Sequence, residues 1–381
     1  MIDFAPTPDQ ESMLDAVTRF LERRLPIDEV RRRDREHIPP YDLLPELGAL
    51  GILGLPFPAQ YGGMASSWIT LALVQERMAR HAYFAGSIVS RVVAFGGMTL
   101  LAYGSEAQRR EWLPRLAAGR ALFALALSEP DAGSDAAAIR TRAVRTASGW
   151  RINGRKTWIS DARGSEQWVV AARSDSSTTG AKGISTFLVP RESPGISMTE
   201  LPKLGNHCMP SFDIGFDDVE IPDTALLGAE GAGFRQLMST LHYSRASMAA
   251  TTTGCAQAAV DFAIAHAKTR MQFGRPLGAN QTIRHRLADM QMRVDQSRLV
   301  VRHLAWLIAE GRPCRREAAQ AKVIATEALQ FVTHHGMQIL ASAAYAADSD
   351  LQRIWRDARL YSFGEGANEI QRDLIARELG L

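Results

Sequence analysis

The sequence predicts an α+β protein in which a helical region, a region of short β-strands and a second helical region follow one another. Two patterns predict this order. Apolar residues recur at helical spacing near the start and again through the last third of the chain, and short β-prone runs separate these stretches. The 381 residues are enough for two or three packed domains. We place them at residues 1–119, 120–230 and 231–381.

The first region begins with the signals of a capped helix. Thr7 suits the N-cap, Pro8 suits the first helical position, and Gln10 completes a T-x-x-Q capping box. Two later segments, around Ile69–Arg80 and Gly86–Tyr103, are also apolar and helical in character. The residues that keep helical spacing after the cap are Met13, Leu14, Val17, Phe20 and Leu21. An all-α N-terminal domain is therefore predicted.

The middle region is expected to consist of short antiparallel strands. Asn153-Gly154 is a strong turn signal between two β-prone runs, Trp150–Ile152 and Lys156–Ile159, which predicts a hairpin. Six or so such strands would form a small barrel or a sandwich. The further β-prone runs are Trp168–Ala172, Ile184–Val189 and Phe212–Phe216.

The last region is expected to be an antiparallel bundle of long helices. Three glycines precede it, Gly228, Gly231 and Gly233, but their order differs from a dinucleotide-binding fingerprint and no βαβ unit follows. We interpret them as the turn that leads into the bundle, which argues against a Rossmann-type nicotinamide enzyme. The predicted helices are Gly231–Met271, Thr282–Glu310, Cys314–Ala344, Leu351–Leu360 and Asn368–Leu379.

The composition of the chain argues against several classes of function. With 44 basic and 41 acidic side chains the net charge is only +3, which argues against nucleic-acid binding. No stretch approaches the ~20 continuous apolar residues of a membrane span, so we expect a cytoplasmic protein that binds no membrane. Cys208, Cys255 and Cys314 stand far apart, and the adjacent His334 and His335 would point in different directions on a helix. No metal site is expected.

Two loops that contain glycine are candidates for chemistry. Ala126–Asp135 offers hydroxyls and backbone N–H groups, which suit a polar ring edge or a phosphate, but also suit a turn that caps itself. Glu365 lies between Gly364 and Gly366, just before a helix. Because glycines let backbone approach a ligand closely, a catalytic carboxylate fits there, and so does a solvated glutamate in an exposed turn. Composition alone leaves both alternatives open.

Six motifs occur in the order of one known family. They are ALSEPDAGSD (126–135), NGRKTWIS (153–160), RMQFGRP (270–276), LADM (287–290), QIL (338–340) and EGANEIQR (365–372). Together they resemble the acyl-CoA dehydrogenase family over essentially the whole chain. The resemblance implies an acyl-CoA dehydrogenase-like fold, with an N-terminal helical domain, a middle antiparallel β-barrel domain and a C-terminal four-helix bundle. It also implies a homotetramer or dimer.

The resemblance implies one FAD per subunit, bound noncovalently and without a Rossmann fold. Leu127 and Ser128 match residues at the pyrimidine edge of the flavin, and Trp158 and Ser160 match residues at its N5 side. Ser134 matches a position near the pyrophosphate or the thioester. The other matched FAD positions, some of which serve a neighbouring subunit, are Arg270, Phe273, Gln281, Gln338, Ser342, Ala367 and Glu369.

By the same resemblance, Glu365 is the catalytic base that takes the α-proton of an acyl thioester, while flavin N5 accepts the β-hydride. A carboxylate can remove this weakly acidic proton when the carbonyl oxygen receives hydrogen bonds that strengthen as the enolate forms. Some relatives keep the base just before a matched arginine, but here Ser244 precedes Arg245. The residues assigned to the substrate are Ser134, Arg91, His242, Arg245 and Gly366.

Arg91 stands out because its segment is otherwise almost wholly apolar. A buried guanidinium without a partner is costly. One interpretation is an ion pair with a protein carboxylate such as Glu76, or a stem that reaches solvent. The other is a contact with a polar or carboxylate group at the tail of a short acyl chain, since the resemblance places this helix at the far end of the acyl pocket.

Departures from the family pattern concern the substrate more than the flavin. They lie at Gly364, Ala367, Ala341-Ser342 and His242, so short, polar or carrier-protein-bound acyl thioesters stand beside acyl-CoA. Three functions stay open: a dehydrogenase that passes electrons to an electron-transfer flavoprotein, an oxidase that passes them to oxygen, and a catalytically silent binding or assembly factor. The chain length favours the first over the second, and Glu365 speaks against the third.

Overall fold

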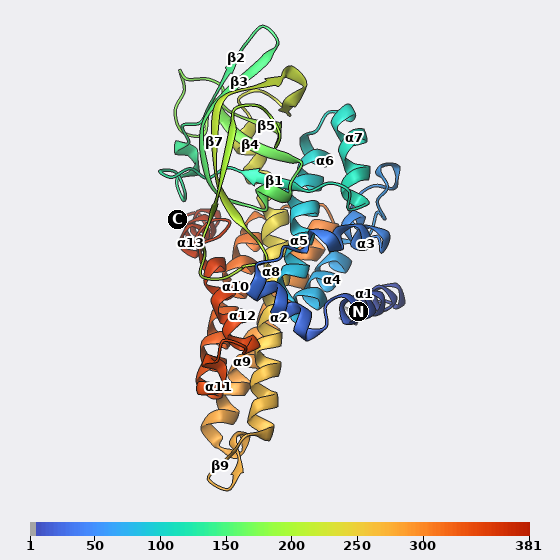
Figure 1. Cartoon of the computed structure of the whole chain (residues 1–381), viewed down its shortest axis with the longest axis vertical. Coiled ribbons are helices and arrows are strands. Elements are labelled where there is room, and N and C mark those ends of the chain that lie inside the picture. The colour runs from blue at the N-terminus through green and yellow to red at the C-terminus, as the bar shows by residue number, and fades with distance from the viewer. Residues whose placement is uncertain (1–4) are drawn as a thin grey trace.

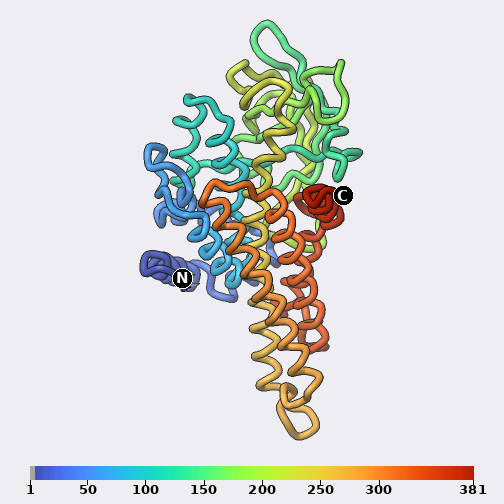
Figure 2. Tube along the Cα trace, turned by 180° about the vertical axis from the view of Figure 1, so that it is seen from behind, coloured from blue at the N-terminus to red at the C-terminus, as the bar shows by residue number. Residues whose placement is uncertain are grey.

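The computed structural model describes residues 5–381, and it shows helices, then strands, then long helices, as the sequence predicts. In Figure 1 the strands lie at one end of an elongated molecule. The C-terminal bundle extends away from them to a hairpin formed by β9 (Met271–Gln272) and β10 (Arg275–Pro276). Figure 2 shows the N-terminal helices and α13 (Asn368–Glu378) on opposite sides of the bundle.

The N-terminal helices begin with the predicted capping box. The Thr7 hydroxyl accepts a hydrogen bond from the Gln10 backbone N–H at 3.3 Å, and the Gln10 side chain accepts one from the Thr7 N–H at 3.0 Å. This pairing satisfies N–H groups that a helix start leaves without partners. The helices are α1 (Pro8–Arg24), α2 (Ile27–Glu36), α3 (Leu44–Ala49), α4 (Trp68–His81), α5 (Tyr83–Ser90), α6 (Thr99–Tyr103) and α7 (Glu106–Ala117).

The most apolar helical stretch is Tyr83–Tyr103, which joins α5, a π-helix at Arg91–Met98 and α6. By length and composition alone it could cross a membrane, so the expectation that no segment approaches this limit was wrong. In this fold 83% of its most apolar window is buried inside the protein, as befits a core helix. π-Helical turns are rare in proteins, but those that occur often lie at functional sites. This one begins at Arg91.

The middle region is one eight-stranded sheet with a core of its own. The strand order is β6-β7-β3-β2-β4-β5-β8, and β1 pairs with β4. Neighbours are antiparallel except β1–β4 and β2–β4, which are parallel. The strands are β1 (Phe123–Ala126), β2 (Arg142–Arg145), β3 (Gly149–Ser160), β4 (Gln167–Arg173), β5 (Ile184–Pro190), β6 (Ile196–Leu201), β7 (Ser211–Pro222) and β8 (Leu226–Leu227).

The hairpin predicted at Asn153-Gly154 does not form. β3 runs unbroken through these residues and pairs with β7 on both sides of them, with a shift of register that marks a bulge. Asn153 and Asp218 exchange two hydrogen bonds of 2.9 Å across the strands. Gly154 has φ +148°, and a Cβ there would lie 2.7 Å from the backbone of Thr141. The long partner strand therefore overrides the local turn preference, and the glycine serves a close approach instead.

The C-terminal region contains the predicted long helices, with ends that differ slightly from those predicted. α8 begins at Gly233, directly after the predicted turn. A Cβ on Gly233 would lie 2.6 Å from the backbone of Ser185 in β5, so glycine lets the helix start against the sheet. The bundle helices are α8 (Gly233–Thr269), α9 (Gln281–Ala309), α10 (Arg315–Leu340) and α12 (Asp350–Ala358), with a short α11 (Ser342–Tyr345) between the last two.

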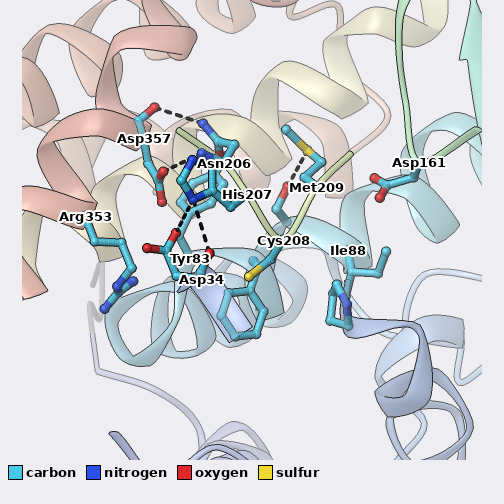
Figure 3. Close-up of a pocket in the computed structure, with 13 residues that line it drawn as sticks. Asp34, Tyr83, Ile88, Asp161, Asn206, His207, Cys208, Met209, Arg353 and Asp357 are labelled. Carbon is cyan, nitrogen blue, oxygen red and sulfur yellow. Dashed lines mark hydrogen bonds and ion pairs between the residues drawn. The ribbon is translucent and has the colours of Figure 1, made fainter. Parts of the chain in front are cut away.

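The three regions meet at a polar junction, where Figure 3 shows the side chains around a pocket. Asp357 of α12 accepts a hydrogen bond from the backbone N–H of Asn206, which precedes β7. Asp34 of α2 accepts one from Arg356 at 2.6 Å, and the His207 ring lies 3.4 Å from the same carboxylate. Asp357 is buried, and burial raises its pKa to about 6.

We expect Asp357→Asn to remove a pH-dependent part of the stability. Because the pKa of Asp357 is raised to about 6 in the folded state, the folded protein binds more protons than the unfolded chain between about pH 4 and 6. Asp357 therefore stabilises the fold below its ordinary pKa, and this contribution of about 3 kcal/mol at most is lost as pH rises through 6. The melting temperature of the variant minus that of wild type should therefore be more positive at pH 8 than at pH 5.

The exposed neighbour Asp348 provides the control for this measurement. Asp348→Asn should shift the melting temperature equally at the two pH values. If Asp357→Asn also shifts it equally, the junction does not carry the pH dependence.

Candidate active site

Glu365 lies in a loop of residues 363–367, called the base loop below, that leads into α13. Its backbone is left-handed, with φ +56°. The side chain is half-buried, and its Oε2 atom is buried without a hydrogen-bond partner in the part of the chain that the structure describes. An unpaired buried oxygen costs about 1–3 kcal/mol or more and calls for an explanation. The atom is therefore open to a partner that the chain itself does not supply.

Cations interact electrostatically with this carboxylate. Arg245 of α8, Lys322 of α10 and Arg91 each interact electrostatically with Glu365. Burial lowers the pKa of Arg245, and the charge of Glu365 opposes that effect. The Nε atom of Arg245 is buried and has no partner among residues 5–381. The preceding Ser244 donates its hydroxyl to the carbonyl of Leu241 at 3.1 Å, so this turn of α8 offers no free base.

The residues after Glu365 fit closely around the base loop. Gly366 has φ +94°, and a Cβ there would lie 2.5 Å from Nε2 of Gln371. The backbone conformation therefore favours glycine, and a Cβ would also displace the end of the Gln371 side chain. Ala367 is half-buried beside it, and Glu369 is exposed in the first turn of α13.

Leu127 and Ser128 lie just after β1 and are tied to β3. The Lys156 ammonium donates to the Leu127 carbonyl at 2.9 Å, and the Thr157 N–H donates to the Ser128 carbonyl at 3.0 Å. The predicted loop therefore runs alongside the strand that carries Trp158. The structure thus brings together two segments that the sequence separates by about thirty residues.

Trp158 occupies an irregularity of β3 that exposes its ring. The register of β3 shifts between Lys156 and Ile159, Trp158 has φ +59°, and its side chain is 57% exposed. Ser160 follows half-buried, with its hydroxyl 3.5 Å from that of Ser211. An uncovered indole close to a serine hydroxyl suits a large planar ring with a polar edge, so these residues fit a flavin.

Glu129 and Lys156 form a buried pair that sequence reasoning missed, although both lie inside matched motifs. Lys156 is fully buried, and its ammonium donates to Glu129 at 2.7 Å. Glu129 also accepts from the backbone N–H groups of Arg140 at 2.6 Å and Thr141 at 3.0 Å. Burial opposes the charge of Glu129, but Lys156 and these donors hold its pKa below the usual value. A signal was present, since a lysine inside a β-prone apolar run needs a buried partner.

Other predicted residues lie far from this group. Arg270 ends α8, Phe273 is 95% exposed in the β9–β10 hairpin, and Gln281 starts α9. Figure 1 places this hairpin at the end of the bundle opposite the sheet. Gln338 and Ser342 are exposed near the end of α10. One chain does not bring these positions together with Leu127 and Trp158.

Two residues assigned to the substrate lie in different surroundings. Ser134 is exposed in the loop after β1, and the neighbouring Gly133 has open space around it. His242 of α8 is half-buried, with its ring centroid 3.9 Å from that of Tyr243. Burial lowers the pKa of His242 to about 4, so its ring is neutral at pH 7.

Arg91 is buried and forms an ion pair with a protein carboxylate, Asp161. Its Nε donates to Asp161 at 3.2 Å, a terminal nitrogen contacts the sulfur of Met209, and the guanidinium lies 5.4 Å from the Phe95 ring centroid. Burial opposes its charge, but Asp161 and Glu365 raise the pKa of Arg91. The suggestion that Glu76 is the partner of Arg91 was wrong. Glu76 pairs with Arg298 at 2.7 Å, whereas Asp161 follows Ser160 directly.

Three family models match the chain in succession. They describe the N-terminal, middle and C-terminal domains of acyl-CoA dehydrogenase and match residues 7–120, 124–219 and 231–380. The chain belongs to the acyl-CoA dehydrogenase family. It is 35% identical over 379 residues to YngJ, a probable acyl-CoA dehydrogenase of Bacillus subtilis, covering 99% of this chain and 100% of that one. It is 36% identical over 375 residues to the short-chain specific acyl-CoA dehydrogenase of Homo sapiens mitochondria, covering 98% and 90%.

Solved structures of similar proteins share the fold. The butyryl-CoA dehydrogenase of Megasphaera elsdenii has a TM-score of 0.96 at 32% identity, covering 100% of both chains. The prolyl acyl carrier protein oxidase AnaB has a TM-score of 0.94 at 26% identity, covering 99% and 100%. PigA, solved with FAD and proline, has 0.94 at 26%, covering 100% of both. This acyl-CoA dehydrogenase is accordingly an FAD-dependent oxidoreductase that acts on CH–CH groups of acyl thioesters.

Proposed function

We propose that Glu365 removes the α-proton of an acyl thioester during α,β-dehydrogenation. The observation that carries this proposal is the buried Oε2 atom without a partner. An α-proton beside a thioester is only weakly acidic, and a positioned base typically accelerates its transfer by about 10²–10⁴. FAD, when bound, supplies the acceptor for the β-hydrogen and its electron pair.

The groups around Glu365 support this role. Negative charge grows on the thioester carbonyl oxygen as the proton leaves, and donors aimed at that oxygen stabilise the transition state. We assign the backbone N–H of Glu365 to this task, and Gly366 leaves space for the thioester. Arg245, His242 and Ser134 are proposed to contact the substrate beyond the reacting carbons. The neutral His242 ring can exchange hydrogen bonds there without the cost of a buried charge.

The flavin ring is proposed to lie against Leu127, Ser128, Trp158 and Ser160. The positions matched to its phosphates and adenosine include Phe273, which lies at the opposite end of the same chain. We propose that a second copy supplies them, in a homotetramer or dimer with one noncovalent FAD per subunit.

The electron acceptor is proposed to be an electron-transfer flavoprotein, because the relatives of highest identity described above are dehydrogenases. Oxygen is the alternative, which the similarity to the oxidase AnaB favours. Oxygen consumption during turnover distinguishes the two.

We propose that the protein is cytoplasmic. Cys208, Cys255 and Cys314 are free and buried, in keeping with the reducing cytoplasm.

Bleaching of the flavin by a panel of thioesters tests the proposed function. The purified protein should be yellow, and at least one acyl-CoA or acyl-carrier-protein thioester should bleach it without added acceptor. The panel should compare the two carriers with the same acyl group. A flavin that no thioester reduces would leave a silent binding or assembly factor as the better interpretation.

The substrate is proposed to carry a short acyl chain with a polar tail. Arg91 and Asp161 form a buried charged pair that interacts electrostatically with Glu365. Because Nε and one terminal nitrogen of Arg91 are engaged, its other terminal nitrogen can meet a polar group of the ligand. A long aliphatic tail would gain little beside such a pair.

Removing Arg91 and Asp161 together should change substrate preference without a large loss of stability. Arg91→Leu alone leaves a buried carboxylate without its cation and should destabilise the fold by about 3–5 kcal/mol. The double variant Arg91→Leu/Asp161→Leu replaces both charges by apolar groups and should regain much of that stability. It should lose bleaching by an ω-carboxylated or hydroxylated thioester and retain bleaching by a plain aliphatic one.

The pair formed by Arg298 and Glu76 is the matched control. Arg298→Leu/Glu76→Leu should leave the ratio of the two bleaching rates unchanged. If Arg91→Leu/Asp161→Leu alters both rates equally, the pair is structural and the polar-tail proposal fails.

A further inference from the structure

Lys322 of α10 is a fully buried cation that none of the roles above uses. Its ammonium donates to Oδ1 of Asn368 at 2.7 Å, to the Gly366 carbonyl at 2.9 Å and to the Ser362 carbonyl at 3.3 Å. An ammonium has three N–H donors, so these oxygens use all of them. Burial lowers the pKa of Lys322 to about 8, which leaves it protonated at neutral pH.

The three acceptors lie on both sides of the base loop. Ser362 immediately precedes the loop, Gly366 lies within it directly after Glu365, and Asn368 is the first residue of α13. Asn368 is in turn joined to Thr326 of α10, whose hydroxyl accepts from its amide at 3.1 Å. A single buried side chain therefore ties both ends of the loop to one long helix.

The left-handed backbone of Glu365 makes the hydrogen bonds from Lys322 important for the shape of the base loop. A non-glycine residue with φ +56° is strained by about 1–2 kcal/mol, and such conformations persist when the surrounding structure holds them. Further hydrogen bonds of the base loop stay local: the Gly364 N–H donates to the Leu360 carbonyl at 2.9 Å, and the Gly366 carbonyl also accepts from the Gln371 side chain at 3.3 Å. Without the ammonium, the carbonyls of Ser362 and Gly366 would lose a donor, and the turn could relax.

We propose that Lys322 is a positioning residue for Glu365, which holds the carboxylate where it meets the α-carbon of the substrate. This inference rests on the proposed role of Glu365 as the base. A misplacement of about 1 Å in such a site can cost about 10²-fold in rate. Removing Lys322 should therefore lower the rate of flavin reduction at saturating thioester and leave the affinity for the thioester nearly unchanged.

The test uses Lys322→Met in the full-length flavoprotein, with the thioester that bleaches wild type fastest. The reduction rate per bound flavin should fall about 10²-fold, with the apparent dissociation constant of the thioester within about threefold of wild type. A second readout needs no substrate. Amide hydrogen exchange in residues 361–371 should speed up by at least about tenfold, because the loop opens more often.

Arg33→Met is the matched control, because Arg33 is a buried cation paired with Glu29 and Asp42 in the N-terminal region. It should lower stability without changing either readout. Equal effects of Lys322→Met and Arg33→Met, or a wild-type rate and exchange in Lys322→Met, would overturn the proposal. If Lys322→Met does not fold, Asn368→Ala carries the test: it keeps the cation, and wild-type values of both readouts would again overturn the proposal.

The failure of this inference is distinguishable from failure of the proposed function. If no thioester bleaches the wild-type flavin, Glu365 is not shown to act as a base. The exchange measurement then still decides whether Lys322 holds the base loop. If wild type is bleached and Lys322→Met is bleached equally fast, the function stands and the positioning role falls.

Discussion

Glu365→Gln is expected to lower the rate of flavin reduction by about 10²–10⁴-fold. The amide matches the carboxylate in shape, so FAD content and thioester affinity should stay close to wild type, but it cannot accept the α-proton. The change also adds an NH₂ donor at a position where the Oε2 atom has no partner among the described residues. Stopped-flow bleaching with saturating thioester measures the effect directly.

Glu378 offers a matched control for this experiment, because it lies on the same helix, α13, and is exposed to solvent. Its carboxylate pairs with Arg315 at 3.2 Å on the surface. In the Glu378→Gln variant, the thioester should reduce the flavin at the wild-type rate. A Glu365→Gln variant that also does so would move the base elsewhere in the chain.

Elements set by local chemistry could be predicted from the sequence. The capping box of Thr7 and Gln10 depends on residues three positions apart, and it forms as predicted. The long helices of the bundle follow a sustained apolar period, so their existence was predictable and only their ends shift. The start of α8 was predictable only approximately: a glycine-rich turn precedes the apolar pattern, the helix was expected from Gly231, and it begins at Gly233.

Contacts between distant residues could not be predicted from these patterns. Asn153-Gly154 carries a turn signal, but the partner strand β7 is long enough to hold β3 straight through it. Arg91 needed a carboxylate, and nothing in the sequence distinguishes Asp161, seventy positions away, from Glu76. The role of Lys322 has the same origin, since its three acceptors lie 40 to 46 positions along the chain.

The site was predictable only through motifs, and the motifs mixed residues of different roles. Leu127, Ser128 and Trp158 were assigned to the flavin by position. Glu129 and Lys156, inside the same two motifs, hold those segments together. A motif match identifies both kinds of residue at once, whereas buried hydrogen bonds distinguish the supporting pair from the exposed indole.

That supporting pair leads to the second large effect, which we expect from Lys156→Met. Lys156 is fully buried and charged, and its loss leaves Glu129 buried with only backbone donors. Removing one partner of a buried pair typically costs about 3–5 kcal/mol. It also releases the Leu127 carbonyl. The variant should unfold at lower denaturant concentration and lose FAD readily.

Two comparisons separate stability from positioning in this variant. Arg151→Met, on the same strand, removes an exposed pair with Glu220 and should cost less than about 1 kcal/mol with normal flavin content. Lys156→Met/Glu129→Leu should regain stability, because two apolar groups replace an unpaired buried charge. It should still bind FAD weakly, because neither new side chain can hold the Leu127 carbonyl or the N–H groups of Arg140 and Thr141. Recovery of normal FAD affinity in the double variant would show that the pair only stabilises the fold.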